Sequence, residues 1–141
     1  MPQQAPQIEI DSPVDTFREY TKAFQALDAR RAAEYFHEPA LLIAPNGIRP
    51  LPTIAAVEQE YKNVMAAMPR DYARTEFTPL SERRLGDDLA MVSGGGSWKN
   101  AANEDLMPFG MTYTLRRTNG RWRIVVAAIH APDGGPQSSR L

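Results

Sequence analysis

The segment from Phe109 to His130 most constrains the fold, because it encodes two β-strands joined by a tight turn. Asn119 and Gly120 between two β-rich runs favour a two-residue type I′ turn, since both residues tolerate the positive φ that this turn requires. The turn sets the register, and side chains alternate between the two faces of a sheet. One face is therefore expected to be almost wholly apolar, with a histidine at its end: Phe109, Met111, Tyr113, Leu115, Trp122, Ile124, Val126, Ala128 and His130.

The same register describes the opposite face of this hairpin. It predicts that Phe109 lies opposite His130 at the end far from the turn. The opposite face begins with threonines and arginines, among them the like-charged pair Arg116 and Arg123. It ends in three apolar residues: Val125, Ala127 and Ile129. Such a mixture is typical of a face that is partly exposed or covered by a partner protein.

Composition excludes several classes of protein. The chain has 141 residues, which suits a single domain with a continuous apolar core. Its formal net charge is −1, so we expect no broad basic surface for nucleic acid or for a membrane. It has no cysteine, which excludes disulfides, thiol nucleophiles and cysteine-based zinc sites. We therefore expect a cytoplasmic protein with no metal or other cofactor, no nucleic-acid partner and no membrane association.

The segment after the first eleven residues carries the signals of a helix. Ser12 and Pro13 are typical of the N-cap and of the first helical position, and Asp15 reaches back as in a capping box. Apolar and aromatic residues then recur at the spacing of one helix face: Val14, Phe17, Tyr20, Thr21, Phe24 and Leu27. Asp28 is placed to cap a second, alanine-rich helix from Ala29 to Phe36.

A short hairpin and a third helix are predicted next. Leu41–Ala44 and Ile48–Leu51 flank a turn at Pro45-Asn46-Gly47, and the prolines confine this hairpin to the edge of a sheet. Thr53 then caps a helix from Ile54 to about Met68, whose inner face carries apolar residues at helical spacing.

Two further strands precede the final hairpin. They are predicted at Tyr72–Leu85 and Ala90–Trp98, and residues 101–108 form a polar connection into the hairpin. The Gly94-Gly95-Gly96 run lies inside the second of these strands and lacks the sequence of a phosphate-binding loop. It indicates a bulge or bend, and the missing side chains would enlarge a cavity.

This order of elements predicts an α+β fold. A cone-shaped, curved antiparallel β-sheet wraps around three N-terminal helices, because a sheet with one apolar face must cover that face. We expect a single domain at residues 12–131, with a flexible leader at 1–11 and a flexible tail at 132–141.

The order of elements and two short motifs resemble the nuclear transport factor 2-like superfamily over about residues 12–131. Its polyketide cyclase-like and ketosteroid isomerase-like branch carries Tyr-x-x-Ala-x-x-x-x-Asp in the first helix, a pattern that Tyr20 to Asp28 approximately match. Gly-x-Trp-x-Ile before the last strand, here Gly120 to Ile124, is a marker of the fold. The resemblance implies a cystatin-like roll whose members commonly pair through the sheet surface opposite the cavity.

The resemblance also implies roles for two positions. In the isomerases a first-helix tyrosine donates a hydrogen bond to a developing enolate, and Tyr20 matches it. The proton-transferring carboxylate of these enzymes lies on the strand after the second helix, just before a proline. Here that position is Ala44, before Pro45. The proton shuttle of the isomerases therefore cannot run unchanged in this chain.

Tyr20 and His130 are the candidate catalytic residues, because they are the polar groups that the pattern turns inward. Tyr20 would donate to a ligand oxygen and His130 would transfer a proton. The alternatives are a core tyrosine and a histidine that caps the strand end. The expected ligand-binding residues are apolar or aromatic, and core packing is the alternative for them too: Phe24, Tyr61, Met65, Trp98, Phe109, Met111 and Tyr113.

Two functions follow as hypotheses, beside the third possibility of a structural protein with no cavity. The first is a cyclase- or isomerase-like pocket protein that acts on an apolar ketone-bearing or cyclic metabolite by metal-free proton transfer. The second is a non-catalytic ligand-binding or dimerisation domain, in which the carboxylate position has become Ala44. For either one we expect a homodimer that forms through the outer face of the sheet, where Val125, Ala127 and Ile129 would be buried.

Overall fold

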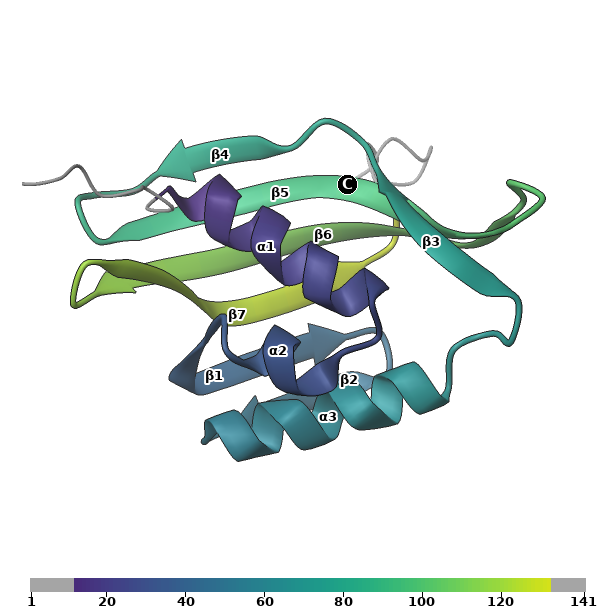
Figure 1. Ribbon diagram of the computed structural model, residues 1–141. Helices are drawn as coiled ribbons and strands as arrows, with labels where there is room; N and C mark the ends of the chain where they lie inside the picture. Colours follow the sequence, from purple (N-terminus) through teal and green to yellow (C-terminus); the bar gives the residue numbers. More distant parts are fainter. Residues whose placement is uncertain (1–11, 133–141) are drawn as a thin grey trace, which may run out of the picture.

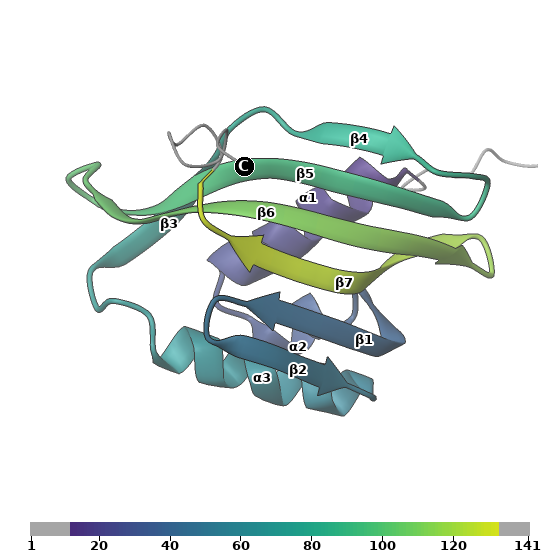
Figure 2. The same ribbon diagram turned by 180° about the vertical axis from the view of Figure 1, so that it is seen from behind.

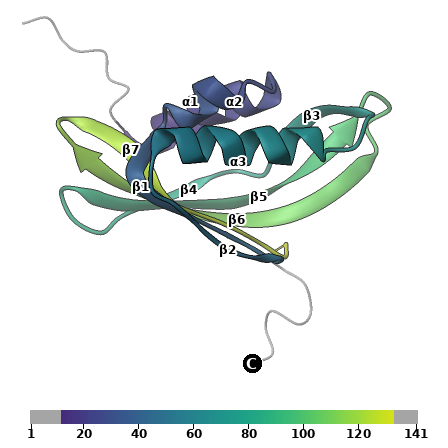
Figure 3. The same ribbon diagram turned by 90° about the horizontal axis from the view of Figure 1, so that it is seen from below.

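The computed structural model describes residues 12–132, in which helices cover one face of a large curved β-sheet (Figure 1). Seen along the sheet, helices and strands form two layers (Figure 3). We call the face toward the helices the inner face and the other the outer face. The predicted α+β fold is thus confirmed. The predicted leader at 1–11, and the predicted tail from residue 133 onward, lie outside the described residues.

The described residues form three helices and seven strands. In chain order they are α1 (Pro13–Gln25), α2 (Ala29–Ala33), β1 (Phe36–Ala44), β2 (Gly47–Leu51), α3 (Ile54–Ala66), β3 (Tyr72–Phe77), β4 (Ser81–Arg84), β5 (Leu89–Asn100), β6 (Asp105–Thr118) and β7 (Arg121–His130).

The strands pair in the order β2-β1-β7-β6-β5-β3, and β4 also pairs with β5. The proline-containing strand β2 lies at the edge of the sheet, as predicted. The sheet is mixed, because β1 runs parallel to β7, and the prediction of a wholly antiparallel sheet was wrong. These two strands are far apart in sequence, so no hairpin turn sets their relative direction.

Helix α1 begins as its sequence predicts. The Ser12 side chain accepts a hydrogen bond from the Asp15 N–H at 3.1 Å, and Pro13 occupies the first turn. Its inner side buries Phe17, whose ring packs edge-on against Tyr113 with centroids 5.0 Å apart. The Thr16 hydroxyl donates to the Trp122 carbonyl of β7 at 3.2 Å. Apolar burial and this hydrogen bond together hold α1 against the sheet.

Two predicted elements are shorter in the structure. Helix α2 ends at Ala33 rather than at Phe36, because Phe36 already pairs with Ile124 in the sheet. The predicted strand from Tyr72 to Leu85 is divided into β3 and β4. Around the break, the Thr78 N–H donates to the Gly95 carbonyl and the Gly95 N–H donates to the Thr78 hydroxyl. The residues between β3 and β4 therefore form a loop that hydrogen-bonds to β5, and the β-ladder is interrupted at this point.

A β-bulge in β7 changes the register of the final hairpin. From the turn as far as Leu115, which lies opposite Ile124, the pairing is the predicted one. Beyond this pair Thr114 lies opposite Val126, so Val125 is an extra residue on β7. An extra residue reverses the facing of every residue that follows it on the same strand.

The bulge turns the end of β7 over. Ala127 is fully buried and Ile129 packs against the core, so both face inward rather than outward as predicted. His130 lies opposite Gly110 instead of Phe109, and with Ala128 it belongs to the outer face. The expectation that His130 lies on the inner face was therefore wrong.

Gly96→Ala is expected to lower the free energy of unfolding by about 1–3 kcal/mol. A Cβ at this position would lie 2.7 Å from the Glu76 carbonyl oxygen and 3.0 Å from Cζ of Phe109, so the backbone of β3 would have to shift. Urea denaturation measures the change. Gly86→Ala is the matched control, because its Cβ would meet no atom within 4 Å. Equal stability of both variants would contradict the close approach of β3 to β5.

Candidate functional site

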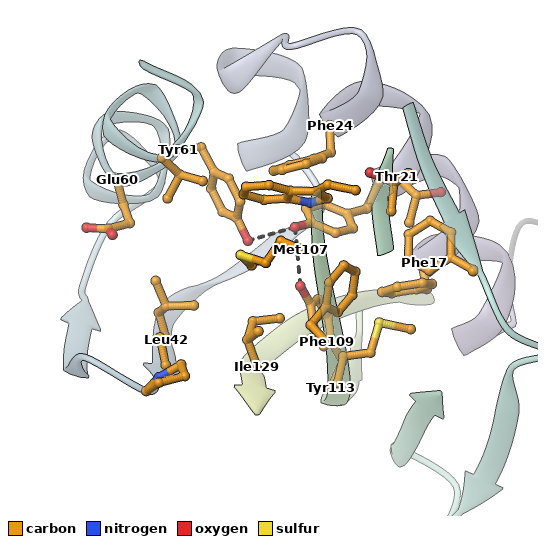
Figure 4. A pocket seen from close by; sticks show the side chains of 18 of the residues that line it. Phe17, Thr21, Phe24, Leu42, Glu60, Tyr61, Met107, Phe109, Tyr113 and Ile129 are labelled. Carbon is orange, nitrogen blue, oxygen red and sulfur yellow. Dashed lines mark hydrogen bonds between the residues drawn. The ribbon is translucent and has the colours of Figure 1, made fainter. Parts of the chain in front are cut away.

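An apolar cavity of about 360 Å³ lies between helices α1 and α3 and the inner face of the sheet (Figure 4). Most of the predicted site residues line it: Tyr20, Phe24, Tyr61, Trp98, Phe109, Met111 and Tyr113. The bulge adds Ile129, which pairs with Met111 on the inner face. Whether each residue contacts a ligand stays a prediction, but one cavity brings them together.

Three tyrosine hydroxyls meet inside this cavity. The Tyr20 hydroxyl lies 2.8 Å from that of Tyr61 and 3.3 Å from that of Tyr113. The residues come from α1, α3 and β6 respectively, and each is at least 95% buried. Figure 4 shows Tyr61 and Tyr113 pointing toward the centre of the cavity, where the dashed lines converge. We call these three residues the hydroxyl cluster.

The hydroxyl cluster has one more donor than it uses. Each tyrosine carries one O–H proton, and Tyr61 and Tyr113 are joined through Tyr20 by two hydrogen bonds. Two bonds use two of the three protons. Among the described residues, the hydroxyls of the cluster make no third contact with the geometry of a hydrogen bond. One O–H is therefore left for a molecule inside the cavity.

Burial keeps the cluster protonated. Loss of solvation raises the pKa of Tyr20 and of Tyr61 well above 10.0, and raises that of Tyr113 as well. For Tyr20 the neighbouring tyrosines add to this, because a second phenolate beside the first would be repelled. At neutral pH the hydroxyl cluster is thus a neutral hydrogen-bond donor, not a base.

The other two predicted site residues do not line the cavity. The imidazole of His130 lies on the outer face, with Nε2 3.2 Å from the Thr112 hydroxyl and Nδ1 2.9 Å from the Ala131 carbonyl. Gly110 makes room for the ring, since a Cβ there would lie 2.6 Å from Cε1 of His130. Met65 packs against the core without reaching the cavity. The structure does not bring Tyr20 and His130 together.

A charged pair lines the cavity at its open end. Arg49 on β2 and Glu60 on α3 face each other with Nε and Oε2 3.4 Å apart, and the Glu60 side chain is only 14% exposed. Neither residue was predicted from the sequence. Helical spacing was the available signal, because Glu60 is three residues after Val57 and four before Val64, which also line the interior side of α3. Ala44 lines the cavity too.

In the described part of the chain, histidine, aspartate and glutamate side chains form no group of three that could hold a metal ion. None of the helices between residues 12 and 132 is long and apolar enough to cross a membrane.

The hydroxyl cluster is expected to resist ionisation in the folded protein. Each tyrosine has a folded pKa raised above its unfolded value of about 10. Above pH 10 the unfolded chain loses protons that the folded chain keeps. The contribution of these tyrosines to the free energy of unfolding is therefore fully present below pH 10 and is lost as the pH rises above it. Each tyrosine lowers the free energy of unfolding by up to about 1.4 kcal/mol per pH unit in that range.

Absorbance at 295 nm, recorded with circular dichroism, measures this titration. Of the five tyrosines in the chain, the three of the cluster should ionise only as the helical signal is lost. Ionisation of all five while the circular dichroism stays native would contradict the burial of the cluster.

Comparisons with known proteins agree with this architecture. No curated protein is similar in sequence to the chain at a significant level. Among solved structures, an NTF-2 like protein of unknown function from Shewanella oneidensis is 18% identical, with a TM-score of 0.66 and coverage of 82% of this chain and 93% of that one. A domain of unknown function with a cystatin-like fold from Nostoc punctiforme is 13% identical, with a TM-score of 0.71 and coverage of 87% and 76%.

A third similar structure comes from Streptomyces avermitilis and is described, provisionally, as a dehydratase from the NTF2-like family. It is 13% identical, with a TM-score of 0.65 and coverage of 85% of this chain and 92% of that one. At these identities the solved structures establish the fold alone. The family described as NTF2-like protein (DUF6841) matches residues 11–132, which is most of the chain. The chain is therefore a member of this NTF2-like family.

Proposed function

We propose that the cavity binds an apolar ketone-bearing or cyclic metabolite, whose oxygen accepts the remaining O–H of the hydroxyl cluster. The observation that carries this proposal is the count of three hydroxyl protons and two hydrogen bonds. The volume of about 360 Å³ falls in the range of small-molecule pockets, and the lining is almost entirely aromatic and aliphatic. The description of the Streptomyces structure as a dehydratase supports small-molecule chemistry in this fold.

A neutral tyrosine donor favours a ligand whose oxygen gains negative charge. In an apolar cavity a fixed O–H interacts more strongly with a developing enolate than with the ketone from which it forms. The cluster would therefore promote enolisation if a group in the cavity accepted the α-proton.

A second candidate, ligand binding without turnover, is favoured by a specific observation. Ala44 lines the cavity at the position where the isomerases carry their carboxylate, and His130 lies on the outer face. Among the lining residues the one carboxylate is Glu60, at the open end. Exchange of the α-protons of 2-tetralone in D2O, followed by NMR, separates the two candidates. Exchange accelerated by the protein supports an enzyme, and an uncatalysed rate supports a binding domain.

Replacing all three cluster tyrosines by phenylalanine should abolish the preference for a ketone. A row of hydrogen-bonded hydroxyls has one bond fewer than it has protons, so one O–H is always left over. The single variants Tyr61→Phe and Tyr113→Phe therefore keep a cluster donor for the ligand, and the triple variant keeps none. We expect wild type to bind 2-tetralone about 2- to 12-fold more tightly than tetralin, the value of one neutral hydrogen bond. In the triple variant the two dissociation constants should be equal. Isothermal titration calorimetry measures them.

Tyr35→Phe is the control for this experiment. It removes one tyrosine hydroxyl from a residue that packs against the core without lining the cavity. It should leave the preference for the ketone unchanged. A triple variant that still prefers 2-tetralone would contradict the role of the cluster, because the loss of three hydroxyls preserves the shape of the cavity.

We also propose that two copies of the chain pair through the outer face. Leu42 lines the cavity, so its neighbours Leu41 and Ile43 face outward. The facing residues on β2 and β7 are Ile48, which is 66% exposed, and Ala128. Figure 2 shows that helices leave this face of the sheet uncovered. An apolar surface of this kind supports an isologous dimer, centred on β1 instead of on the three residues expected from the sequence.

Ile43→Asp is expected to convert the dimer to a monomer, because it places a charge in the centre of this apolar surface. Sedimentation velocity at tens of micromolar measures the change. Leu85→Asp is the control, since Leu85 is 45% exposed beyond the end of β4 and away from the proposed interface. A wild-type protein that sediments as a monomer would rule the dimer out.

A further inference from the structure

The open end of the cavity is lined by both apolar and polar residues. Its exposed lining residues are Pro45 and Asn46 in the turn between β1 and β2, and Met107 on β6. Arg49 and Glu60 meet at this end from β2 and α3. We call Asn46, Arg49 and Glu60 the mouth. The polar lining side chains are thus the hydroxyl cluster deep in the cavity, the mouth at its entrance, and Thr21 and Thr75, whose hydroxyls bond to the Arg18 carbonyl and the Tyr72 hydroxyl.

The contacts of Arg49 at the mouth are long. Its Nε lies 3.4 Å from Oε2 of Glu60, and its Nη1 donates to Oδ1 of Asn46 at 3.3 Å. Strong charge-assisted hydrogen bonds of this type measure about 2.7–2.9 Å. The Arg49 side chain is also 37% exposed. The guanidinium is therefore held in place without being saturated.

The mouth has more donors than acceptors. A guanidinium carries five N–H groups, of which Arg49 directs two toward Glu60 and Asn46. Its other N–H groups have no acceptor among residues 12–132. The Asn46 amide adds two more N–H groups, while the acceptors of the mouth are the Glu60 carboxylate and the Asn46 oxygen already engaged by Arg49. A ligand group that accepts hydrogen bonds would use the free N–H donors of the mouth, whereas the positive charge of Arg49 would repel a cationic group.

We propose that the mouth binds the carboxylate of the ligand, so that the cavity takes an apolar keto acid or aromatic acid. The planar guanidinium of Arg49 can bind a carboxylate through two parallel hydrogen bonds. The ligand's other oxygen reaches the hydroxyl cluster, and its apolar body fills the space between. This inference rests on the proposed function and narrows its substrate class to carboxylic acids.

Glu60 has the opposite effect from Arg49 on such a ligand. It orients the guanidinium through their contact at 3.4 Å, and its negative charge repels a second carboxylate at the same place. Removal of Arg49 should therefore weaken binding of the carboxylate, and removal of Glu60 should strengthen it. A purely structural ion pair would not produce that pattern.

A matched pair of rigid probes tests the proposal by isothermal titration calorimetry. The first is 4′-acetylbiphenyl-4-carboxylate, and the second is 4-acetyl-4′-methylbiphenyl, which has a methyl group in place of the carboxylate. Wild type should bind the acid at least tenfold more tightly than the methyl compound, as expected for a hydrogen-bonded charge. Arg49→Gln should abolish this difference, and Glu60→Gln should strengthen binding of the acid several-fold. Neither substitution should change the affinity for the methyl compound.

Arg83→Gln is the control, because it removes the same charge from an exposed residue of β4 that is not part of the cavity. It should leave both affinities unchanged. Removing one partner of a partly buried ion pair can lower stability, so circular dichroism verifies the fold of each variant.

Four results would overturn the inference. If wild type binds the acid and the methyl compound with equal affinity, the carboxylate site is overturned and the proposed function still stands. The same conclusion follows if 2-tetralone binds and neither biphenyl does. Weaker binding of the acid by Glu60→Gln overturns the opposed roles of the ion pair. If 2-tetralone and both biphenyls all fail to bind, the proposed function itself is overturned together with this inference.

Discussion

The contact of the Tyr20 hydroxyl with those of Tyr61 and Tyr113 joins three of the elements that bound the cavity. Helix α1, helix α3 and strand β6 each contribute one of these residues, and the ring of Tyr20 packs against those of the other two at centroid distances of 5.8 and 5.9 Å. Polar groups placed so deeply in an aromatic core must bond to one another. The same requirement that orients the helices over the sheet also leaves one proton directed at the cavity.

The bulge in β7 is the second constraint on this site. It turns Ile129 into the cavity and His130 out of it. Without the bulge, the imidazole would face the same space as the hydroxyl cluster. The side chain that was the natural candidate for proton transfer therefore lies on the outer face against Gly110. What remains inside is a neutral donor surrounded by apolar side chains, which suits binding of a polarised oxygen.

The sequence predicts most of the fold because the relevant signals are local. The Ser12 cap, the helical spacing of α1 and the Asn119-Gly120 turn each depend on residues within a few positions of one another. The parallel pairing of β1 with β7 depends on residues about ninety positions apart, and the bulge at Val125 lies in an uninterrupted apolar run with no glycine to mark it. Neither has a signal within the strand itself.

The candidate site divides in the same way. Aromatic residues such as Tyr61 and Trp98 follow from periodicity, since inward-facing positions repeat along a helix or strand. The mouth does not, because Arg49 and Glu60 come together only when β2 and α3 pack side by side. The sequence alone does not show whether a charged residue on an otherwise apolar helix face is solvated or paired. For Glu60 the structure shows the partner, which lies on β2. The donors of the mouth become visible only in three dimensions, whereas Tyr20 was predicted as a donor from the sequence.

A crystal structure of the protein with 2-tetralone bound would show directly whether the hydroxyl cluster holds the oxygen of a ligand. We predict that the ketone oxygen lies about 2.5–3.0 Å from one tyrosine hydroxyl of the cluster, with the rings of the ligand against the aromatic lining. A ligand whose oxygen points toward the open end of the cavity, with the hydroxyl cluster untouched, would contradict it.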